Sequence, residues 1–228
     1  MSQAPRGAAT SPDAGFLLPE RRARIDAVVA QRTRTLTVVM EAFADPQNTS
    51  AVLRTAESFG VQEVHVVVGP QKRYDRNKKI SQNADKWLEV VRWKDTPSCL
   101  AALKARGFRV YATHLGEGVR GLSELTFAEP AALVFGNEHA GVSAEARRLA
   151  DACFAIPMRG FSQSFNVSVA AAICLARAVD RRELERGRHG DLPPAELEAL
   201  RARFYALSVK QRAKVARAEQ AAARGAGR

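Results

Sequence analysis

Short runs of β-branched and other apolar residues alternate with helical segments from residue 36 onward, and this alternation limits the possible folds more than any other feature of the chain. The spacing predicts strands in LTVVMEAF, VQEVHVVV, WLEVVRW, FRVYATHL, AALVFGN and CFAIPM, with helices between them. Such alternation is typical of a parallel sheet covered by helices on both faces. We therefore expect an α/β fold. No GxGxxG follows an early strand, which disfavours a dinucleotide-dependent dehydrogenase.

The segments between the strands carry residues that commonly begin and end helices. Asn48, Thr96, Ser143 and Asn166 are each followed by a helical pattern, and their side chains are suited to accept hydrogen bonds from the first free amides. We expect each of them to be an N-cap. The last of these helices is long and should run to about Gly187, because glycine readily adopts the left-handed conformation that ends a helix.

Composition divides the chain into three parts. Residues 1–19 are rich in Ala, Pro, Gly and Ser without periodicity, so we expect them to be disordered. Residues 20–187 are expected to form one domain, and the short helix at its start has Pro19 at its first position. Residues 188–228 read as a linker followed by a basic helical tail, which could be a solvated helix, a dimer arm or an RNA contact.

The charge balance indicates a polyanionic partner. Lys and Arg number 35 against 24 Asp and Glu, giving a net charge of +11, which suits nucleic acid, with anionic membrane as the competing interpretation. No apolar run approaches the roughly 18 residues of a membrane span, and the N-terminus lacks the apolar core of a signal peptide. We expect a soluble, cytoplasmic protein. The three cysteines are far apart and show no metal-ligand spacing, so neither a metal site nor a disulfide is expected.

Three polar segments stand where predicted strands give way to helices. DPQNTSAVLRTAESFG contains Asn48 and Arg54, FGNEHAG contains Glu138, and IPMRGFSQSFNVSVA contains Ser164 and Asn166. Taken singly, Arg54 reads as a solvated helix arginine and Asn166 as a simple N-cap. Two polar residues at the start of a helix too apolar for exposure nevertheless imply donors that face a cavity or a partner. A fourth segment, VYATHLG, ends a strand in the way typical of ligand sites in α/β proteins.

In order and spacing, these segments resemble the three motifs of the SpoU family of RNA 2′-O-ribose methyltransferases, within the SPOUT superfamily. The likeness covers roughly residues 20–180. It implies a deep trefoil knot, in which the third-motif segment is threaded through a loop. Composition and periodicity do not predict such a knot, because knots are rare exceptions to the rules of chain connection. The resemblance also implies a homodimer whose active site takes residues from both subunits.

The resemblance further implies S-adenosylmethionine as the methyl donor, bound in a bent pose and without a metal. On this chain the cofactor pocket would be formed by Thr113, Gly116, Gly136, Ile156, Met158 and Phe165. The catalytic set would be Arg54, Asn48, Glu138, Ser164 and Asn166. Phe165 stands where the family usually has Leu, which changes the shape of the pocket without removing an interaction.

The mechanism implied by the family places Arg54 beside the ribose hydroxyl. A guanidinium with a pKa above about 12 is a reluctant base. We therefore favour stabilisation of the developing alkoxide by Arg54, with an adjacent RNA phosphate polarising the arginine or accepting the proton. Asn48 and Glu138 would orient Arg54 or the ribose.

Within the family, the sequence is most similar to members that act on tRNA, which implies 2′-O-methylation of guanosine-18 in the tRNA D-loop. Methylation of ribosomal RNA is the main alternative, and a non-catalytic RNA-binding protein is a weaker one. Arginines near the two ends of the chain are expected to contact RNA phosphates. They are Arg21, Arg22, Arg24, Arg177, Arg181 and Arg182.

Overall fold

The computed structural model describes residues 12–68, 86–116 and 118–225, and the contacts between them divide the chain into two compact units. One unit is Arg32–Asp191, and the other combines Met1–Gln31 with Leu192–Arg228. The sequence placed the N-terminal helix in one domain with the sheet. The contacts instead group that helix with the C-terminal helix. The expectation that residues 1–19 are disordered was wrong for Pro12–Phe16, which form a short 3-10 helix, and residues 1–11 lie outside the described part of the chain.

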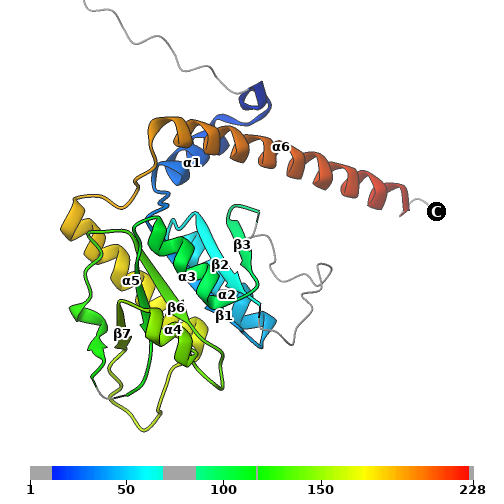
Figure 1. The fold of residues 1–228 in the computed structure, drawn as a ribbon. Helices are drawn as coiled ribbons and strands as arrows, with labels where there is room; N and C mark the ends of the chain where they lie inside the picture. The colour runs from blue at the N-terminus through cyan, green and yellow to red at the C-terminus, as the bar shows by residue number, and fades with distance from the viewer. Residues whose placement is uncertain (1–11, 69–85, 117, 226–228) are drawn as a thin grey trace, which may run out of the picture. The chain divides into compact units, whose positions relative to one another are not determined.

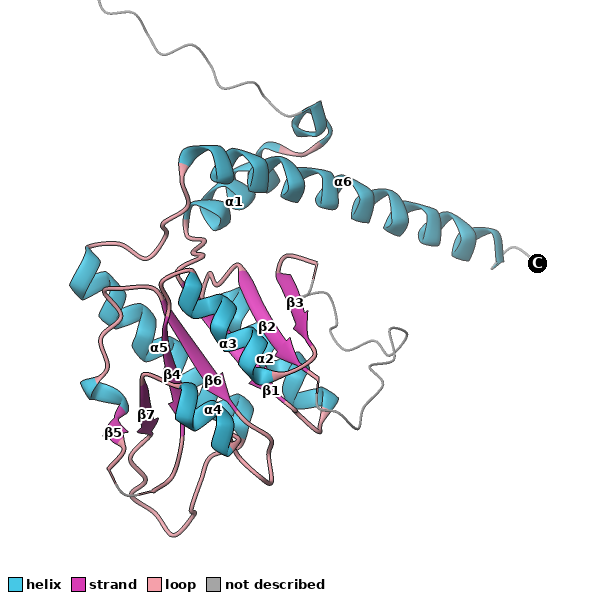
Figure 2. Ribbon diagram, in the orientation of Figure 1, coloured by secondary structure: helices cyan, strands magenta, loops and turns pink. Residues whose placement is uncertain are grey.

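A parallel sheet forms the centre of the unit Arg32–Asp191 (Figure 2). Its described strands are β1 (Leu36–Glu41), β2 (Glu63–Val67), β3 (Glu89–Trp93), β4 (Arg109–Thr113), β5 (Arg120–Gly121), β6 (Ala131–Phe135) and β7 (Ala152–Ala155). They follow the order β3-β2-β1-β6-β4-β7-β5, and neighbouring strands among them are parallel. The predicted α/β class and the six predicted strands are confirmed. The two-residue β5 is too short to leave a periodic signal.

Helices cover both faces of this sheet (Figure 1). α2 (Pro46–Ser58) and α5 (Val167–Arg186) lie on one face, and α3 (Thr96–Ala105) and α4 (Ala144–Leu149) lie on the other. The side chains of β1 alternate between the two cores. Val38 and Met40 pack with α2 and α5, whereas Val39 packs with α3 and α4. Because helices cover both faces of the sheet, β1 is buried at every position rather than at alternate positions.

Two of the four expected N-caps are confirmed. The side chain of Ser143 accepts a hydrogen bond from the amide of Ala146 at the start of α4. That of Asn166 accepts from the amide of Ser168 at the start of α5. α5 then ends at Gly187, whose φ of 71° is the left-handed conformation expected there.

The other two N-caps were wrong by one to three residues. Asp45 caps α2 and accepts from the amide of Gln47, so Asn48 lies within the first turn. Asp95 caps α3 in the same way, so Thr96 is the first helical residue. In α2 the proline at position 46 explains the shift, because proline is favoured at the first position of a helix. Both displaced residues use their side chains for contacts between elements instead.

The unit that combines the chain ends contains η1 (Pro12–Phe16), α1 (Pro19–Ala30) and α6 (Pro194–Gly225). The predicted helices near both ends are confirmed. Asp26 of α1 accepts a hydrogen bond from Tyr205 at 2.6 Å and lies 3.0 Å from Nε of Arg201, which joins the two helices. Within the described residues, no helix combines the length and the apolar character that crossing a membrane requires.

Candidate active site

A cavity of about 580 Å³ lies beyond the carboxyl ends of β4, β6 and β7. Ligands of parallel α/β proteins commonly bind at this edge of the sheet. Five of the six predicted cofactor residues line it, namely Thr113, Gly136, Ile156, Met158 and Phe165. Gly116 does not line the cavity. In the loop after β4, the last residue that lines it is Leu115.

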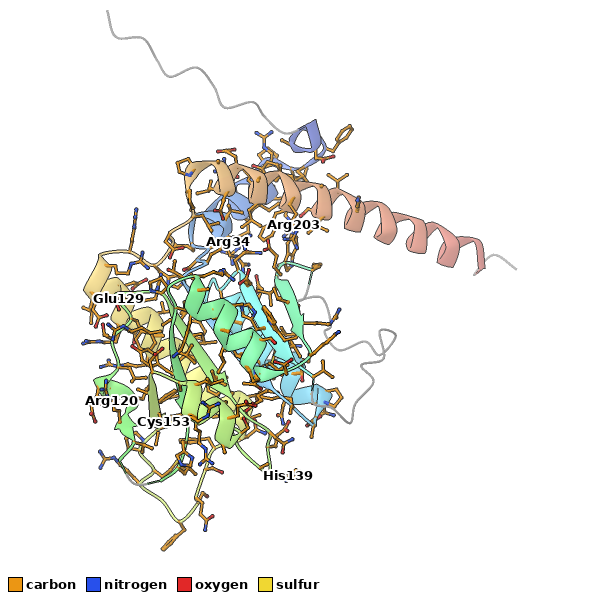
Figure 3. All side chains as sticks on the ribbon, viewed as in Figure 1. Arg34, Arg120, Glu129, His139, Cys153 and Arg203 are labelled. Atoms are coloured by element: carbon orange, nitrogen blue, oxygen red, sulfur yellow. The ribbon has the colours of Figure 1, made fainter. Side chains whose placement is uncertain are left out.

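The loop after β6, whose His139 is labelled in Figure 3, closes tightly on itself. The amide of Gly141 donates to the carbonyl of Asn137 at 2.8 Å, and Gly141 has a φ of 69°. A Cβ added at Gly136 would lie 2.1 Å from the carbonyl carbon of Gly141. The two glycines of FGNEHAG therefore allow two backbone segments to meet at the wall of the cavity.

Asn137 shapes the same loop, although the sequence did not single it out. Its Nδ2 donates to the carbonyl of Ala42 at 2.9 Å, and its Oδ1 accepts from the amides of His139 and Ala140. Ala42 has a φ of 54°, which is unusual for a residue other than glycine. Asn137 thus ties the loop after β6 to the loop after β1.

Glu138 binds the start of α2. Its carboxylate accepts from the amide of Ala44 at 2.8 Å, the amide of Asp45 at 3.1 Å and Nδ2 of Asn48 at 2.9 Å. Burial raises the pKa of Glu138, but these hydrogen bonds outweigh it and leave the pKa below its usual value. Glu138 is therefore an anionic anchor for the loop between β1 and α2.

Asn48 connects this anchor to the third polar segment. It is buried, and its Oδ1 accepts a hydrogen bond from Nδ2 of Asn166 at 3.1 Å. Asn166 both caps α5 and donates to α2. It is therefore an N-cap and also a polar residue that faces the cavity, as the two interpretations of the sequence proposed. Ser164 lies nearby in the cavity wall and is exposed. The structure thus brings together four of the five predicted catalytic residues, as Glu138, Asn48 and Asn166 in one hydrogen-bonded chain and Ser164 beside it.

Arg54, the fifth, is not brought to the cavity within one chain. It lies on the exposed face of α2, it is not among the lining residues, and no hydrogen bond or ion pair of its side chain is found in the described part of the protein. Asn48 and Arg54 lie on the same helix, but Asn48 is buried and Arg54 is exposed. The guanidinium of Arg54 is therefore available to a partner outside the chain.

The chain is similar to known proteins in sequence and in fold. Residues 35–176 match the family model described as the SpoU rRNA Methylase family. The chain belongs to the SpoU methylase family. It is 42% identical over 167 residues to the tRNA (guanosine(18)-2′-O)-methyltransferase of Thermus thermophilus, covering 73% of this chain and 85% of that protein.

Two solved structures extend the likeness. The crystal structure of the Aquifex aeolicus TrmH/SpoU tRNA modifying enzyme matches with a TM-score of 0.73 and 31% identity, over 83% of this chain and 97% of that one. The SpoU methyltransferase AviRb from Streptomyces viridochromogenes, solved in complex with AdoMet, matches with a TM-score of 0.60 and 26% identity. That match covers 70% of this chain and 62% of AviRb.

This SpoU-family protein also uses residues that sequence reasoning missed. Glu41, buried at the end of β1, accepts hydrogen bonds from the hydroxyl of Thr96 and from both the amide and the hydroxyl of Ser143. It therefore fixes the first turns of α3 and α4 against the sheet. A charged residue at the end of an otherwise apolar strand was the available signal. His114 and Arg147 also line the cavity without having been assigned a role.

The arginines expected to contact RNA fall into two groups. Arg21 and Arg24 are exposed on α1, and Arg22 is half-buried with Nη1 3.4 Å from the carbonyl oxygen of Ala14. Arg177 is half-buried on α5, and Arg181 pairs with Glu185 one turn later. These five remain compatible with a role in binding RNA.

The assignment of Arg182 to RNA was wrong. Its side chain is 0% exposed, and it pairs with Asp191 at 2.8 Å while donating to Thr35 at 2.7 Å. Burial is the main cause that lowers the pKa of Arg182, followed by the positive charge of Arg186. The residue is a buried structural cation, because Asp191 folds back against α5 to meet it.

Proposed function

We propose that this protein transfers the methyl group of S-adenosylmethionine to the ribose 2′-hydroxyl of guanosine-18 in tRNA. The observation that carries the proposal is the hydrogen-bonded chain from Glu138 through Asn48 to Asn166, which joins three distant segments beside one cavity. The identity of 42% to a tRNA (guanosine(18)-2′-O)-methyltransferase supports the choice of substrate.

The cavity fits the proposed methyl donor in size and in chemistry. A volume of about 580 Å³ lies within the usual range for small-molecule sites. Ile156, Met158 and Phe165 offer apolar surface to an adenine, and backbone groups near Gly136 approach closely because no side chain intervenes. S-adenosylmethionine, when bound, supplies an activated methyl group. The residues of the chain supply its orientation.

A homodimer would complete this site. Phe161, Phe165 and Val169 are 110%, 40% and 45% exposed, at or shortly before the start of α5, and Phe165 lines the cavity. Large exposed apolar side chains favour burial against another protein surface. We infer that a second copy covers them, and that Arg54 of one protomer reaches the cavity of its partner. This arrangement gives the exposed Arg54 a partner that the single chain does not provide.

Within that site, each catalytic candidate has a distinct task. Glu138 and Asn48 hold the loop between β1 and α2 against the cavity, and Asn166 holds the start of α5. Ser164 offers a hydroxyl to the ribose. Arg54 stabilises the alkoxide that forms as the 2′-hydroxyl loses its proton, and an adjacent RNA phosphate accepts that proton. The planar guanidinium suits simultaneous contact with two oxygens.

Three further parts of the proposal rest on the family resemblance. The segment between β7 and α5 is threaded through a loop to form a trefoil knot. The exposed Arg21 and Arg24, with the other expected arginines except Arg182, contact tRNA phosphates. The reaction needs no metal, and the enzyme works in the cytoplasm on tRNA.

A methylation assay tests the function directly. The purified protein is incubated with labelled S-adenosylmethionine and three RNAs: an unmodified tRNA transcript, the same transcript with adenosine in place of guanosine-18, and ribosomal RNA. Label is then mapped as 2′-O-methyl nucleotides. We expect a single modified residue in the first RNA, none in the second, and no loss of activity in EDTA. Label in ribosomal RNA alone would support the alternative substrate. No label in any RNA would support a non-catalytic RNA-binding protein.

A further inference from the structure

Two basic side chains from different elements meet in the wall of the cavity. His114 directly follows β4, Arg147 lies on α4, and both line the cavity. Nη1 of Arg147 lies 3.0 Å from Nε2 of His114. Nη1 also lies 3.4 Å from Nδ1 of the same ring, and because a guanidinium only donates hydrogen bonds, the ring nitrogen that lacks a hydrogen accepts from it. The histidine therefore holds the arginine in place without neutralising its charge.

The charge of Arg147 has no acidic partner within the described residues. Its helical neighbour Arg148, by contrast, lies 3.9 Å from Glu145. The carboxylate of Glu138 also lines the cavity, but two backbone amides and Asn48 already occupy it. A half-buried cation without a counter-charge is unfavourable. The cavity thus offers an unmatched positive charge to whatever binds there.

We propose that Arg147, positioned by His114, binds the carboxylate of the methionine portion of the cofactor. This inference rests on the proposed function, which makes S-adenosylmethionine the ligand. The adenosine is uncharged, and the sulfonium and ammonium groups are positive, so the carboxylate is the one group of this ligand that complements a guanidinium. The planar fork of arginine can donate two parallel hydrogen bonds to it.

Calorimetric titration with two matched ligands tests the assignment without methyl transfer. One ligand is S-adenosylhomocysteine, and the other is its decarboxylated analogue, which keeps the ammonium group. Arg147→Gln should weaken binding of S-adenosylhomocysteine by about tenfold to a hundredfold, as expected for loss of a charge-assisted hydrogen bond. Binding of the decarboxylated analogue should change less than about twofold. Arg148→Gln, the matched control on the same helix, should leave both affinities unchanged.

Conservative variants distinguish the contact between Arg147 and the carboxylate from the hydrogen bond with His114 that positions Arg147. Arg147→Lys keeps the charge but loses the fork, so its loss of affinity should lie between those of wild type and Arg147→Gln. His114→Gln keeps a side-chain acceptor for Arg147, whereas His114→Ala removes it. We therefore expect His114→Ala to weaken the binding of S-adenosylhomocysteine but not that of the decarboxylated analogue. His114→Gln should lose less affinity than His114→Ala. Circular dichroism of each variant verifies that it is folded.

Each outcome decides between the inference and the function on which it rests. If wild type binds neither ligand, the proposed cofactor and this inference fail together. Suppose instead that wild type binds S-adenosylhomocysteine. If Arg147→Gln then binds it equally well, or loses affinity for both ligands to the same extent, the carboxylate assignment is wrong and the proposed function stands. Weaker binding of tRNA alone, with unchanged affinity for S-adenosylhomocysteine, would assign Arg147 to an RNA phosphate and overturn the inference.

Discussion

Nδ2 of Asn166 donates a hydrogen bond to Oδ1 of Asn48, 3.1 Å away and separated from it by 118 residues of sequence. The same Asn48 donates from its Nδ2 to the carboxylate of Glu138. Its amide therefore has a fixed direction, with the oxygen toward α5 and the nitrogen toward the loop after β6. The three polar segments that the sequence singled out are joined through this one side chain.

Asn48→Asp should break this chain while nearly preserving its shape. The new carboxylate would place a second negative charge against Glu138, where the amide of Asn48 now donates. We expect a loss of stability on the order of 2 kcal/mol, measured by urea unfolding, together with loss of methyl transfer. Gln47→Glu adds the same charge at an exposed position of the same turn and should have little effect. Equal stability of the two variants would contradict the assigned role of Asn48.

Gly136→Ala should disrupt the cavity wall. The added methyl would meet the backbone of Gly141 at 2.1 Å, so one of the two loops must move. We expect reduced thermal stability and at least a tenfold weaker affinity for S-adenosylhomocysteine, measured by calorimetry. Gly160→Ala is a suitable control, because its Cβ would meet nothing within 4 Å. Normal binding by Gly136→Ala would show that this wall does not hold the ligand.

Glu63 should make the stability of the protein depend on acid pH. Although burial raises the pKa of Glu63, hydrogen bonds and charge interactions with His65 and Arg106 lower it from 4.5 to about 2. Because the folded pKa lies below the unfolded one, the stabilisation is complete above pH 4.5 and is lost as the pH falls toward 2. It amounts to on the order of 3 kcal/mol at neutral pH.

Urea unfolding of wild type and Glu63→Gln at several pH values measures this contribution. The difference in free energy of unfolding between the two proteins should be constant from pH 5 to pH 7 and should shrink below pH 4.5. A difference that grows as the pH falls would have the wrong sign and would contradict the assignment.

Arg182→Gln should damage the fold rather than RNA binding alone. The change leaves the buried carboxylate of Asp191 without its closest cation, which costs roughly 3–5 kcal/mol for a buried pair. Arg177→Gln, at a half-buried position on the same helix, should cost less than about 0.5 kcal/mol. Urea unfolding and tRNA binding should be measured for both. A fully stable Arg182→Gln that binds tRNA weakly would restore the original assignment to RNA.

Arg54→Lys should remove activity and leave the fold intact. The exposed side chain has no partner among the described residues, so stability and affinity for S-adenosylhomocysteine should match wild type. Methyl transfer should fall by about a hundredfold or more, because lysine lacks the planar fork that the proposed alkoxide contact needs. Full activity of the lysine variant would show that a simple positive charge is sufficient.

Mixed dimers test whether Arg54 acts across subunits. Arg54→Ala and Asn166→Ala should each be inactive as homodimers. Co-expressed, they should regain part of the wild-type activity, because one cavity of the mixed dimer is intact and receives the arginine of the other protomer. No recovery in isolated mixed dimers would place Arg54 in the site of its own chain.

The candidate site was predicted in part from local patterns. Glu138 and Asn166 stand out because polar residues follow apolar strands or precede an apolar helix, and such breaks are visible within a few residues of sequence. Arg147 gave no such signal. On a helix it resembles its neighbour Arg148, and the position of His114, directly after β4, distinguishes the two.

The sequence by itself determined the alternation of strands and helices, the helix starts at Ser143 and Asn166, and the presence of three polar segments. These features depend on apolar periodicity and on hydrogen bonds within one turn, which neighbouring residues settle. The tertiary structure alone decided that Arg182 is buried and that Arg54 does not line the cavity of its own chain. Whether a charge is buried or exposed depends on groups distant along the chain, such as Asp191, and no local pattern contains their position.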